Sequence, residues 1–316
     1  MKYKILIGAG GSGTSFAAAS RLKANWGSEI EIIITDTNDK DYVTSSIFSS
    51  YYYKVPKASD PKFKSEIIKI ITKHNVNMYI PILNEEIIIA NEIKKEFKKL
   101  NVWCSPEYTK LINKDYAHNF LNNIGIKTPK AYNLDEAKLQ EKVFIKPKNG
   151  FGSKNAQILI SSQLEILSLD YNDYIIQEVC ISPEVTIDSF YDPKSDTCYA
   201  YCRERIEVKS GVCTKTRLFF DQELSEIAYK IAKAIHQKGI ICFQVMKSPV
   251  GWVVTDLNLR HGAGTALTCA AGFDIISATF ALKMGNEYKH FVRHLSPAEE
   301  IILTRQYSEF IMKVTQ

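Results

Sequence analysis

The sequence predicts an α/β protein in which a Rossmann-like domain precedes a larger α+β region. Through the first 108 residues, short apolar runs alternate with amphipathic stretches, which is the pattern of a parallel sheet covered by helices. A glycine-rich turn directly follows the first apolar run. Beyond residue 140, strand-like segments follow one another with few helices between them, which is typical of antiparallel sheets.

The N-terminal elements follow from hydrophobic periodicity. Residues 3–7 form a continuous apolar run that ends in glycines, as expected of a buried parallel strand. Residues 63–74 place apolar side chains at helical spacing. By the same criteria, the predicted strands are 3–7, 30–35, 77–82 and 101–104, and the predicted helices are 12–22, 63–74 and 85–100.

Strands predominate in the rest of the chain. A helix over residues 113–123 ends before Gly125. Val250-Gly251 suits a hairpin turn between two strands. The predicted strands are 143–146, 156–160, 174–179, 184–191, 197–206, 240–247 and 251–257, helices cover 222–238 and 266–282, and a polar stretch follows.

Composition excludes several classes of function. The length of 316 residues corresponds to about two domains at roughly 150 residues each. The net charge is only +5 and the lysines are spread along the chain, so we expect no nucleic-acid partner. The seven cysteines and six histidines form no CxxC or HExxH motif, which argues against zinc.

The sequence also predicts a cytoplasmic protein that does not cross a membrane. Scattered cysteines fit a reducing compartment better than a disulfide framework. The N-terminus runs straight into a strand pattern and does not resemble a signal peptide. The most apolar stretch, residues 266–282, contains Gly272 and Asp274 and is short for a membrane span, so we interpret it as one buried helix.

The turn Gly8-Ala9-Gly10-Gly11-Ser12-Gly13 fits the GxGxxG pattern between a strand and a helix, and Asp36 ends the second predicted strand. Glycines that let backbone approach a pyrophosphate, with an acid for a ribose hydroxyl, suit a dinucleotide such as NAD. A tight strand–helix turn in a domain with another task also fits. The motif alone does not separate the two interpretations.

A second glycine-rich segment lies between two lysines. Lys146 ends a predicted strand, and Lys154 lies further along the same loop. The residues between them include Gly150, Gly152 and Ser153. Backbone N–H groups and lysine charges in such a loop can surround a triphosphate. An exposed hairpin loop is the alternative interpretation.

The third candidate segment covers residues 177–184. A strand end followed by a short linker can present the backbone of Gln177, Glu178 and Val179 to the edge of an adenine. Glu184 can then hold ribose hydroxyls. A glutamate at the start of a strand is also common on ordinary surfaces, and that interpretation stays open.

The fourth segment is the most informative. Asp256 and Asn258 are two residues apart on a predicted strand, so both face one side of the sheet, and Gln244 lies on the preceding strand. Together they offer oxygen ligands suited to Mg²⁺. Arg260 continues that face, and the glycine turn at residues 261–265 offers N–H groups to an anion. A polar strand end at a sheet edge is the alternative.

The order of these segments resembles the ATP-grasp superfamily, in its carbamoyl-phosphate-synthetase-like, carboxylate–amine ligase branch. The segments that carry the resemblance are Asn113-Lys114-Asp115, Val143-Phe144-Ile145-Lys146-Pro147 with the glycine loop, Ile176-Gln177-Glu178-Val179 followed by Glu184-Val185-Thr186-Ile187-Asp188, and Asp256-Leu257-Asn258-Leu259-Arg260 with Gln244. They occur in the family's order and cover nearly the whole chain.

The resemblance implies three parts of the chain. These are a Rossmann-like pre-ATP-grasp domain at 1–108, a two-subdomain ATP-grasp fold at 109–295 with a small lid subdomain at about 126–183, and a C-terminal segment at 296–316. It implies an enzyme that uses ATP and Mg²⁺, or Mn²⁺, to activate a small-molecule carboxylate as an acyl phosphate that an amine attacks. A homodimer is compatible with it. In this family the N-terminal glycine turn usually serves the substrate side, which disfavours NAD.

The resemblance also assigns residues. The expected catalytic residues are Arg260 and Lys154, and the amides of residues 262–265 would join Arg260 in stabilising the acyl-phosphate oxygens. The expected metal ligands are Gln244, Asp256 and Asn258. The expected ATP-binding residues are Lys114, Lys146, Gly150, Gly152, Ser153, Gln177, Glu178, Val179 and Glu184. The expected substrate-side residues are Arg203, Cys213, Gly262 and Gly264; for Arg203 and Cys213, a charged strand face with one buried thiol is the alternative.

The chain departs from the family pattern at the metal strand. The usual glutamate is Asp256, a leucine stands before Arg260 where proline is common, and His261 follows where many relatives have an uncharged residue. The expected absence of a biotin-carboxylase-like C-terminal domain disfavours acetyl-CoA carboxylase chemistry. Full carbamoyl-phosphate synthesis is disfavoured because it needs two such units.

Three other functions stay open at this point. One is an ATP-dependent small-molecule kinase of the same fold. The second is an NAD-linked oxidoreductase that uses residues 8–13, which would need a catalytic histidine or lysine in the central region. The third is a silent nucleotide-binding regulator, against which the intact Lys146, Asp256 and Asn258 argue.

Overall fold

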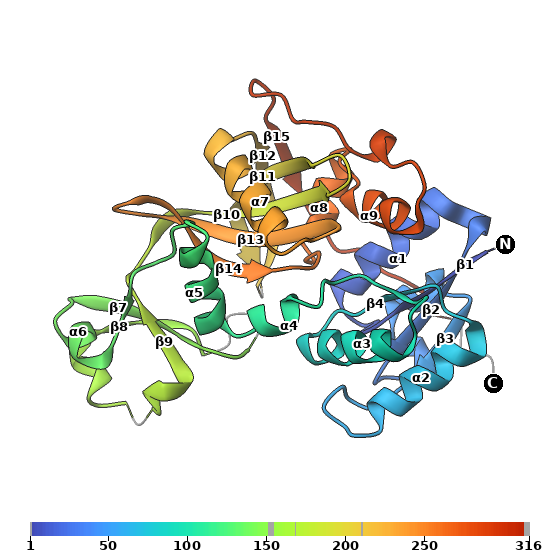
Figure 1. Cartoon of the computed structure of the whole chain (residues 1–316), viewed down its shortest axis with the longest axis horizontal. Coiled ribbons are helices and arrows are strands. Elements are labelled where there is room, and N and C mark those ends of the chain that lie inside the picture. Colours follow the sequence, from blue (N-terminus) through green and yellow to red (C-terminus); the bar gives the residue numbers. More distant parts are fainter. Residues whose placement is uncertain (1, 151–154, 168, 210, 313–316) are drawn as a thin grey trace.

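The computed structural model describes residues 2–150, 155–167, 169–209 and 211–312. Within these residues the strands form three sheets, one of five, one of four and one of six strands. Figure 1 shows an N-terminal domain in blue and cyan, a small lobe in green, and a large sheet in yellow and orange. The α/β class that the sequence predicts is confirmed.

The N-terminal domain is a parallel sheet between helices. Its strand order is β3-β2-β1-β4-β5, with β1 at Tyr3–Ile7, β2 at Ile30–Asp36, β3 at Tyr51–Lys54, β4 at Met78–Ile80 and β5 at Asn101–Val102. Neighbouring side chains of β1 enter different cores. Ile5 packs with α1 (Gly13–Trp26), whereas Leu6 packs with α2 (Phe63–His74) and α3 (Asn84–Glu96). Because helices cover both faces of this sheet, its central strands are continuous runs of apolar residues.

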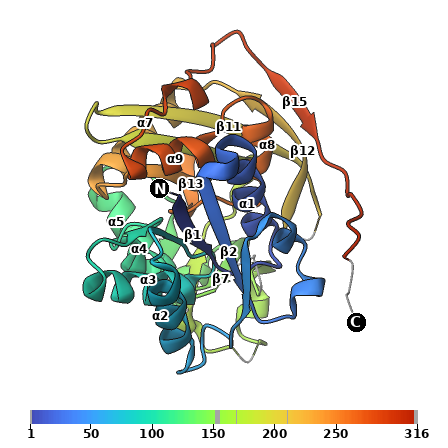
Figure 2. The same cartoon turned by 90° about the vertical axis from the view of Figure 1, so that its right-hand side faces the viewer.

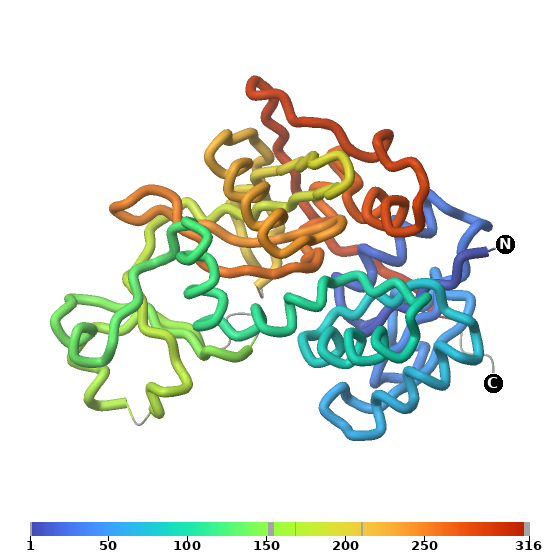
Figure 3. The backbone as a smooth tube through the Cα atoms, in the orientation of Figure 1, coloured from blue at the N-terminus to red at the C-terminus, as the bar shows by residue number. Residues whose placement is uncertain are grey.

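A connection through α4 (Tyr108–Leu111) and α5 (Lys114–Asn123) leads to the small lobe, as the tube in Figure 3 shows. We call this lobe the lid: a four-stranded antiparallel sheet with the helix α6 (Leu134–Lys138). The order is β6-β9-β7-β8, with β6 at Ala131–Tyr132, β7 at Lys142–Pro147, β8 at Gln157–Ile160 and β9 at Tyr174–Gln177. The lid has its own core, formed by Ala137, Val143, Ile145, Leu159, Leu164 and Ile176.

The large sheet is antiparallel and has the order β14-β13-β10-β11-β12-β15. Its strands are β10 (Ile181–Asp192), β11 (Thr197–Lys209), β12 (Val212–Phe219), β13 (Gly239–Ser248), β14 (Gly251–Asn258) and β15 (Ile301–Thr304). The helices α7 (Gln222–Ala234) and α9 (Ile275–Met284) pack on it.

The N-terminal domain and the large sheet share one hydrophobic core. It runs from Ile5 and Leu22 through Phe280 to Phe243 on β13. In Figure 2, α1 lies next to α8 (Thr265–Ala270) and α9, and residues of these helices are in contact. The two parts are therefore one packed body, to which the lid is attached.

The expectation of a single helix over residues 266–282 is wrong, because the structure has α8 and α9 there. Gly272 between them has a φ of +95°, which a helix cannot continue through. Asp274 then caps α9 by accepting a hydrogen bond from the Ser277 N–H. The strands β3, β6, β12 and β15 were not predicted either. In the part of the chain that the structure describes, no helix is long and apolar enough to cross a membrane.

Candidate active site

A cleft of about 500 Å³ lies between the lid, α5 and the large sheet. Its wall contains most of the residues predicted to form the site: Lys114, Lys146, Gly150, Gln177, Glu178, Val179, Glu184, Arg203, Cys213, Gln244, Asp256, Asn258, Arg260, Gly262 and Gly264. The three others, Gly152, Ser153 and Lys154, lie outside the residues that the structure describes.

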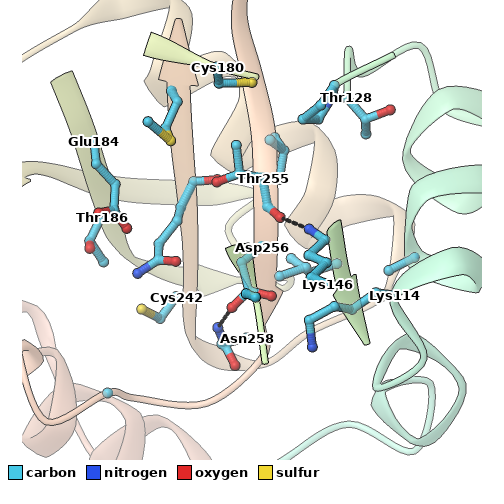
Figure 4. A pocket seen from close by; sticks show the side chains of 18 of the residues that line it. Lys114, Thr128, Lys146, Cys180, Glu184, Thr186, Cys242, Thr255, Asp256 and Asn258 are labelled. Atoms are coloured by element: carbon cyan, nitrogen blue, oxygen red, sulfur yellow. Dashed lines mark hydrogen bonds between the residues drawn. The ribbon is translucent and has the colours of Figure 1, made fainter. Parts of the chain in front are cut away.

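The predicted metal ligands lie together on adjacent strands. Asp256 and Asn258 are side by side in Figure 4, and Asn258 Nδ2 donates to Asp256 Oδ2 over 2.6 Å. Gln244 on β13 is paired in register with Asp256. The remaining oxygens of these three side chains form a small set of hard donors. Elsewhere in the described chain, no three His, Cys, Asp or Glu side chains gather to bind a metal.

Lys146 connects the lid to β14, the strand that carries two of the predicted metal ligands. It lies on β7, only 9% of it is exposed, and its Nζ donates to the Thr255 carbonyl over 2.6 Å (Figure 4). Burial lowers the pKa of Lys146, and the nearby Asp256 carboxylate opposes this shift. A cation is thus held next to the candidate metal ligands.

Lys114 fastens the glycine loop to α5. Asn113 caps this helix by accepting from the Tyr116 N–H over 3.0 Å. From the first turn, Lys114 Nζ donates to the Gly150 carbonyl over 3.0 Å, and its N–H donates to the Lys148 carbonyl over 2.8 Å. Two lysines, Lys114 and Lys146, therefore face the cleft beside the described part of the loop.

The segment after β9 leaves backbone groups free. The Glu178 N–H donates to the Lys130 carbonyl, and its carboxylate accepts from the Lys130 N–H, each over 2.9 Å. Gln177 is buried at the end of β9. The N–H and carbonyl of Val179 form no hydrogen bond within the described ranges. They remain available to a ligand in the cleft.

Glu184 is oriented by a neighbouring strand. Its carboxylate lies 3.2 Å from Arg205 Nε on β11. In Figure 4, Glu184 and Thr186 lie on the opposite side of the cleft from Lys146 and Lys114. A ligand that touches both sides must therefore span the cleft.

Arg203 belongs to a buried network that sequence reasoning missed. Its Nε donates to Asp188 over 3.0 Å, and Asp188 also accepts from the hydroxyls of Thr265 and Thr268, over 2.8 and 2.6 Å. Arg203 and Asp188 are both buried. The alternating polar residues 184, 186 and 188 on one face of β10 are the signal that could have identified Asp188.

Residues 262–264 form a turn over the Arg203 guanidinium. A Cβ atom on Gly264 would lie 2.6 Å from Arg203 Nη2, so this contact requires glycine. The expectation that four amides point at a ligand needs correction. The Gly262 N–H donates to Thr265 Oγ1 and the Thr265 N–H to the Gly262 carbonyl, so these two amides are occupied. The N–H groups of Ala263 and Gly264 have no partner among the described residues.

Arg260 lines the cleft after β14. Its Nη1 donates to the His261 carbonyl over 3.1 Å, and its buried Nε has no hydrogen-bond partner in the described chain. Cys213 on β12 also lines the cleft, but its Sγ already contacts the Lys215 carbonyl over 3.2 Å. Of these two residues, Arg260 therefore has N–H groups that can donate hydrogen bonds to a ligand.

The N-terminal glycine turn lies outside the cleft wall. The Gly11 N–H donates to Asp36 Oδ2 over 2.8 Å, and the Asn38 N–H donates to Asp36 Oδ1 over 2.9 Å. One oxygen of Asp36 thus bonds to the glycine turn, and the other bonds to the residue two positions after Asp36. A Cβ on Gly10 would lie 2.4 Å from Ile34 Cγ2, which gives this glycine a packing role. A Cβ on Gly13 would lie 3.6 Å from the Ala263 Cβ, so the turn abuts the one over Arg203.

Comparison with known families gives two matches along the chain. Residues 5–104 match the PylC-like, N-terminal domain, and residues 112–264 match the ATP-grasp domain. No curated protein matches the sequence.

Solved structures with the same fold include complexes with adenine nucleotides. The biotin carboxylase domain dimer of Hydrogenobacter thermophilus 2-oxoglutarate carboxylase, in complex with MgADP, ADP and bicarbonate, is 13% identical with a TM-score of 0.72, covering 93% of this chain and 73% of that one. N5-carboxyaminoimidazole ribonucleotide synthetase from Thermotoga maritima is 16% identical with a TM-score of 0.70, covering 92% and 78%. A complex of biotin carboxylase with beta-gamma-ATP from Campylobacter jejuni is 15% identical with a TM-score of 0.70, covering 91% and 72%. At these identities the likeness is one of fold.

Proposed function

Because the chain belongs to the ATP-grasp superfamily, we propose that it is a ligase that uses ATP to convert a small-molecule carboxylate into an acyl phosphate, which an amine attacks. The observation that carries this proposal is the meeting of two elements in the cleft. Lys146 of the lid bonds to the Thr255 carbonyl, directly before Asp256 on the metal strand. A phosphate-binding cation and a metal-binding carboxylate are thus adjacent.

The related structures support a nucleotide in this cleft. The biotin carboxylase domain from Hydrogenobacter thermophilus holds MgADP and bicarbonate. In this chain, the free backbone groups of Val179 would receive the adenine edge, and Glu184 would accept ribose hydroxyls. Lys114, Lys146 and the loop at 150–154 would contact the phosphates. Lysine charges and backbone N–H groups are suited to that task.

The donor set beside Lys146 fits Mg²⁺. Asp256 offers a carboxylate oxygen, and Asn258 and Gln244 offer amide oxygens, all hard donors from adjacent strands. One protein carboxylate is enough when substrate phosphates supply further ligands. When bound, Mg²⁺, or Mn²⁺ in its place, neutralises charge on the phosphates.

The chain's own residues then serve the reacting carboxyl group. A carboxylate oxygen attacks the γ-phosphorus, the bond to the ADP oxygen breaks, and the amine nitrogen later attacks the acyl carbon, with loss of a proton and release of phosphate. Arg260 and the N–H groups of Ala263 and Gly264 would stabilise the negative oxygens of the acyl phosphate. Lys154 would contribute charge from the loop.

We extend the proposal to the rest of the molecule. The lid subdomain would comprise about residues 126–183 and cover the nucleotide. The substrates would be small molecules, and the enzyme would act in the cytoplasm, where its seven free cysteines stay reduced. A homodimer is supported by the dimer of the related biotin carboxylase domain.

The test compares ADP release and product mass in a screen of small carboxylates with amines. Asp256→Asn removes the only carboxylate of the donor set, so we expect roughly 100-fold slower ADP release with an unchanged melting temperature. Asp41→Asn, on an exposed residue of the N-terminal domain, is the matched control and should behave like the parent.

Near-parental turnover in Asp256→Asn would place the metal elsewhere. A phosphorylated product that accumulates with every amine would identify a kinase instead of a ligase. Stabilisation by NAD but not by an ATP analogue with Mg²⁺ would overturn the assignment altogether, because only a ligand of the native state raises the melting temperature.

A further inference from the structure

A row of four side chains crosses the large sheet beneath the cleft. Asp256 on β14 is paired with Gln244 on β13, Gln244 with Thr186 on β10, and Thr186 with Arg203 on β11. All four line the cleft. Neighbouring strands lie about 4.8 Å apart, so the backbones of Asp256 and Arg203 are roughly 14 Å apart. The row has a metal end at Asp256 and an arginine end at Arg203.

Two polar groups at the arginine end have no hydrogen-bond partner among the described residues. They are the hydroxyl of Thr186 and Nη1 of Arg203, and each of these residues is only 2% exposed. Buried donors without partners are costly and therefore rare in native proteins. Because both residues line the cleft, a ligand oxygen there would satisfy them.

Positive charge exceeds negative charge at this end. Asp188 pairs with Arg203 and already accepts two threonine hydroxyls. Arg305, which follows β15, donates from Nη2 to the Ala263 carbonyl over 2.9 Å. Burial lowers the pKa of Arg305, and the charge of Arg203 lowers it further. Within the described residues neither Arg305 nor Arg260 forms an ion pair with an acid.

We propose that the arginine end binds a substrate carboxylate that is distinct from the one activated at the metal end. Thr186 Oγ1 and Arg203 Nη1 would donate to it, and Arg305 would add charge. This carboxylate can belong to the acid substrate, as in a dicarboxylate, or to the amine, as in an amino acid. The assignment of the activated carboxylate to the metal end rests on the proposed function. The anion site at the arginine end does not.

Thr186→Val is the sharpest variant. It removes a hydroxyl that bonds to nothing in the described chain, so the fold should keep its melting temperature. The loss of one hydrogen bond to a carboxylate should raise KM for the substrate that carries it about 10-fold, with KM for ATP unchanged. Thr214→Val is the matched control, because this buried threonine of β12 lies outside the cleft wall and bonds to Glu207.

Matched substrates separate the two sources of the carboxylate. Succinate is compared with butyrate and glutarate with valerate, each with free amino acids or amino-acid amides as acceptors. The readouts are ADP release, product mass and melting temperature with Mg²⁺ and a non-hydrolysable ATP analogue. For the parent, we expect kcat/KM to be at least ~10-fold lower when the second carboxylate is absent or replaced by an amide. In Thr186→Val, kcat/KM should differ less between the two kinds of substrate.

Each outcome decides the proposal. Equal kcat/KM for masked and unmasked substrates would overturn it, as would a preference for a phosphate in place of the carboxylate. Failure of every dicarboxylate and amino acid to raise the melting temperature would also overturn it. A dicarboxylate that raises the melting temperature of the parent more than that of Thr186→Val supports the anion site. If hydroxylamine then traps no acyl phosphate, the proposed ligase function fails although the anion site is retained.

Discussion

The buried ammonium group of Lys146 has one hydrogen bond within the residues that the structure describes, to the Thr255 carbonyl. Without nucleotide, this bond does not offset the free energy that removing the charge from water costs, and burial therefore lowers the pKa of Lys146. Lys146→Met keeps the volume and removes the charge. We expect an unchanged or higher melting temperature without nucleotide, and ATP binding weaker by about 1.5–3 kcal/mol, or one to two decades in Kd, by calorimetric titration.

The control for this prediction lies on the same strand. Lys142→Met also removes a lysine charge from β7, but Lys142 is exposed. It should bind ATP like the parent. If Lys146→Met also binds ATP like the parent, then Lys146 does not touch the phosphates.

His261 gives the protein a pH dependence of stability. The residue is fully buried, its ring bonds to the Thr14 carbonyl over 3.1 Å, and burial lowers its pKa from 6.5 to about 4. Between these pH values the unfolded chain binds a proton that the folded protein does not. The contribution of neutral His261 to the free energy of unfolding is therefore fully present above about pH 6.5 and is lost as the pH falls toward 4.

Urea unfolding at pH 7.5, 6 and 5 tests this dependence. Between pH 7.5 and pH 5 the parent should lose about 2 kcal/mol from this residue. His261→Gln does not titrate, so its free energy of unfolding should fall less steeply over the same range. Parallel pH curves for the two proteins would show that His261 is not the responsible group.

At the scale of elements, the start of α9 depends on one aspartate. Asp274 accepts hydrogen bonds from the Ser277 N–H and hydroxyl, and from Asn25 Nδ2 on α1. It thus caps α9 and fastens it to the N-terminal domain. Asp274→Ala should lower the free energy of unfolding by about 2 kcal/mol, measured by urea denaturation.

Asp221 provides the comparison. It caps α7 with one side-chain bond, to the Leu224 N–H. Asp221→Ala should therefore cost less, about 1 kcal/mol. Equal losses for the two variants would mean that the bonds of Asp274 to α1 add nothing. A double-mutant cycle with Asn25→Ala would measure the coupling directly.

Local patterns predicted the elements whose partners are close in sequence. β1, β2 and α2 have continuous or periodic apolar positions, and their predicted bounds lie near the observed ones. β12 was missed because bulges between β11 and β12 disturb its alternation. β15 was missed because it is short and pairs with a strand more than 80 residues earlier. A window of local sequence contains no information on such a partner.

The site divides in the same way. Asp256 and Asn258 could be identified because their spacing alone puts them on one face. The alternation of Glu184, Thr186 and Asp188 marks one polar face of β10, but the roles of Thr186 and Asp188 depend on strand register and on α8, which supplies the two threonines. The bonds that occupy the Gly262 and Thr265 amides also depend on that turn's tertiary geometry.

For the whole molecule, the distribution of hydrophobic core matters more than any single contact. One core joins the N-terminal domain to the large sheet and contains most of the buried apolar side chains. The cleft has one wall on that body and the other on the lid. Asp256, Arg203 and Arg260 thus lie on the body with the larger core, whereas Lys146 lies on the lid.

The lid's separate core of six buried side chains implies its own local unfolding equilibrium. Backbone amides of β7 and β9 should exchange with deuterated solvent faster than those of β10 and β13, by a route that leaves the main body folded. A non-hydrolysable ATP analogue with Mg²⁺ at about 100 times its Kd should slow exchange in the lid roughly 100-fold, and β10 and β13 far less. Uniform slowing across both bodies would mean that lid and sheet open as one cooperative unit.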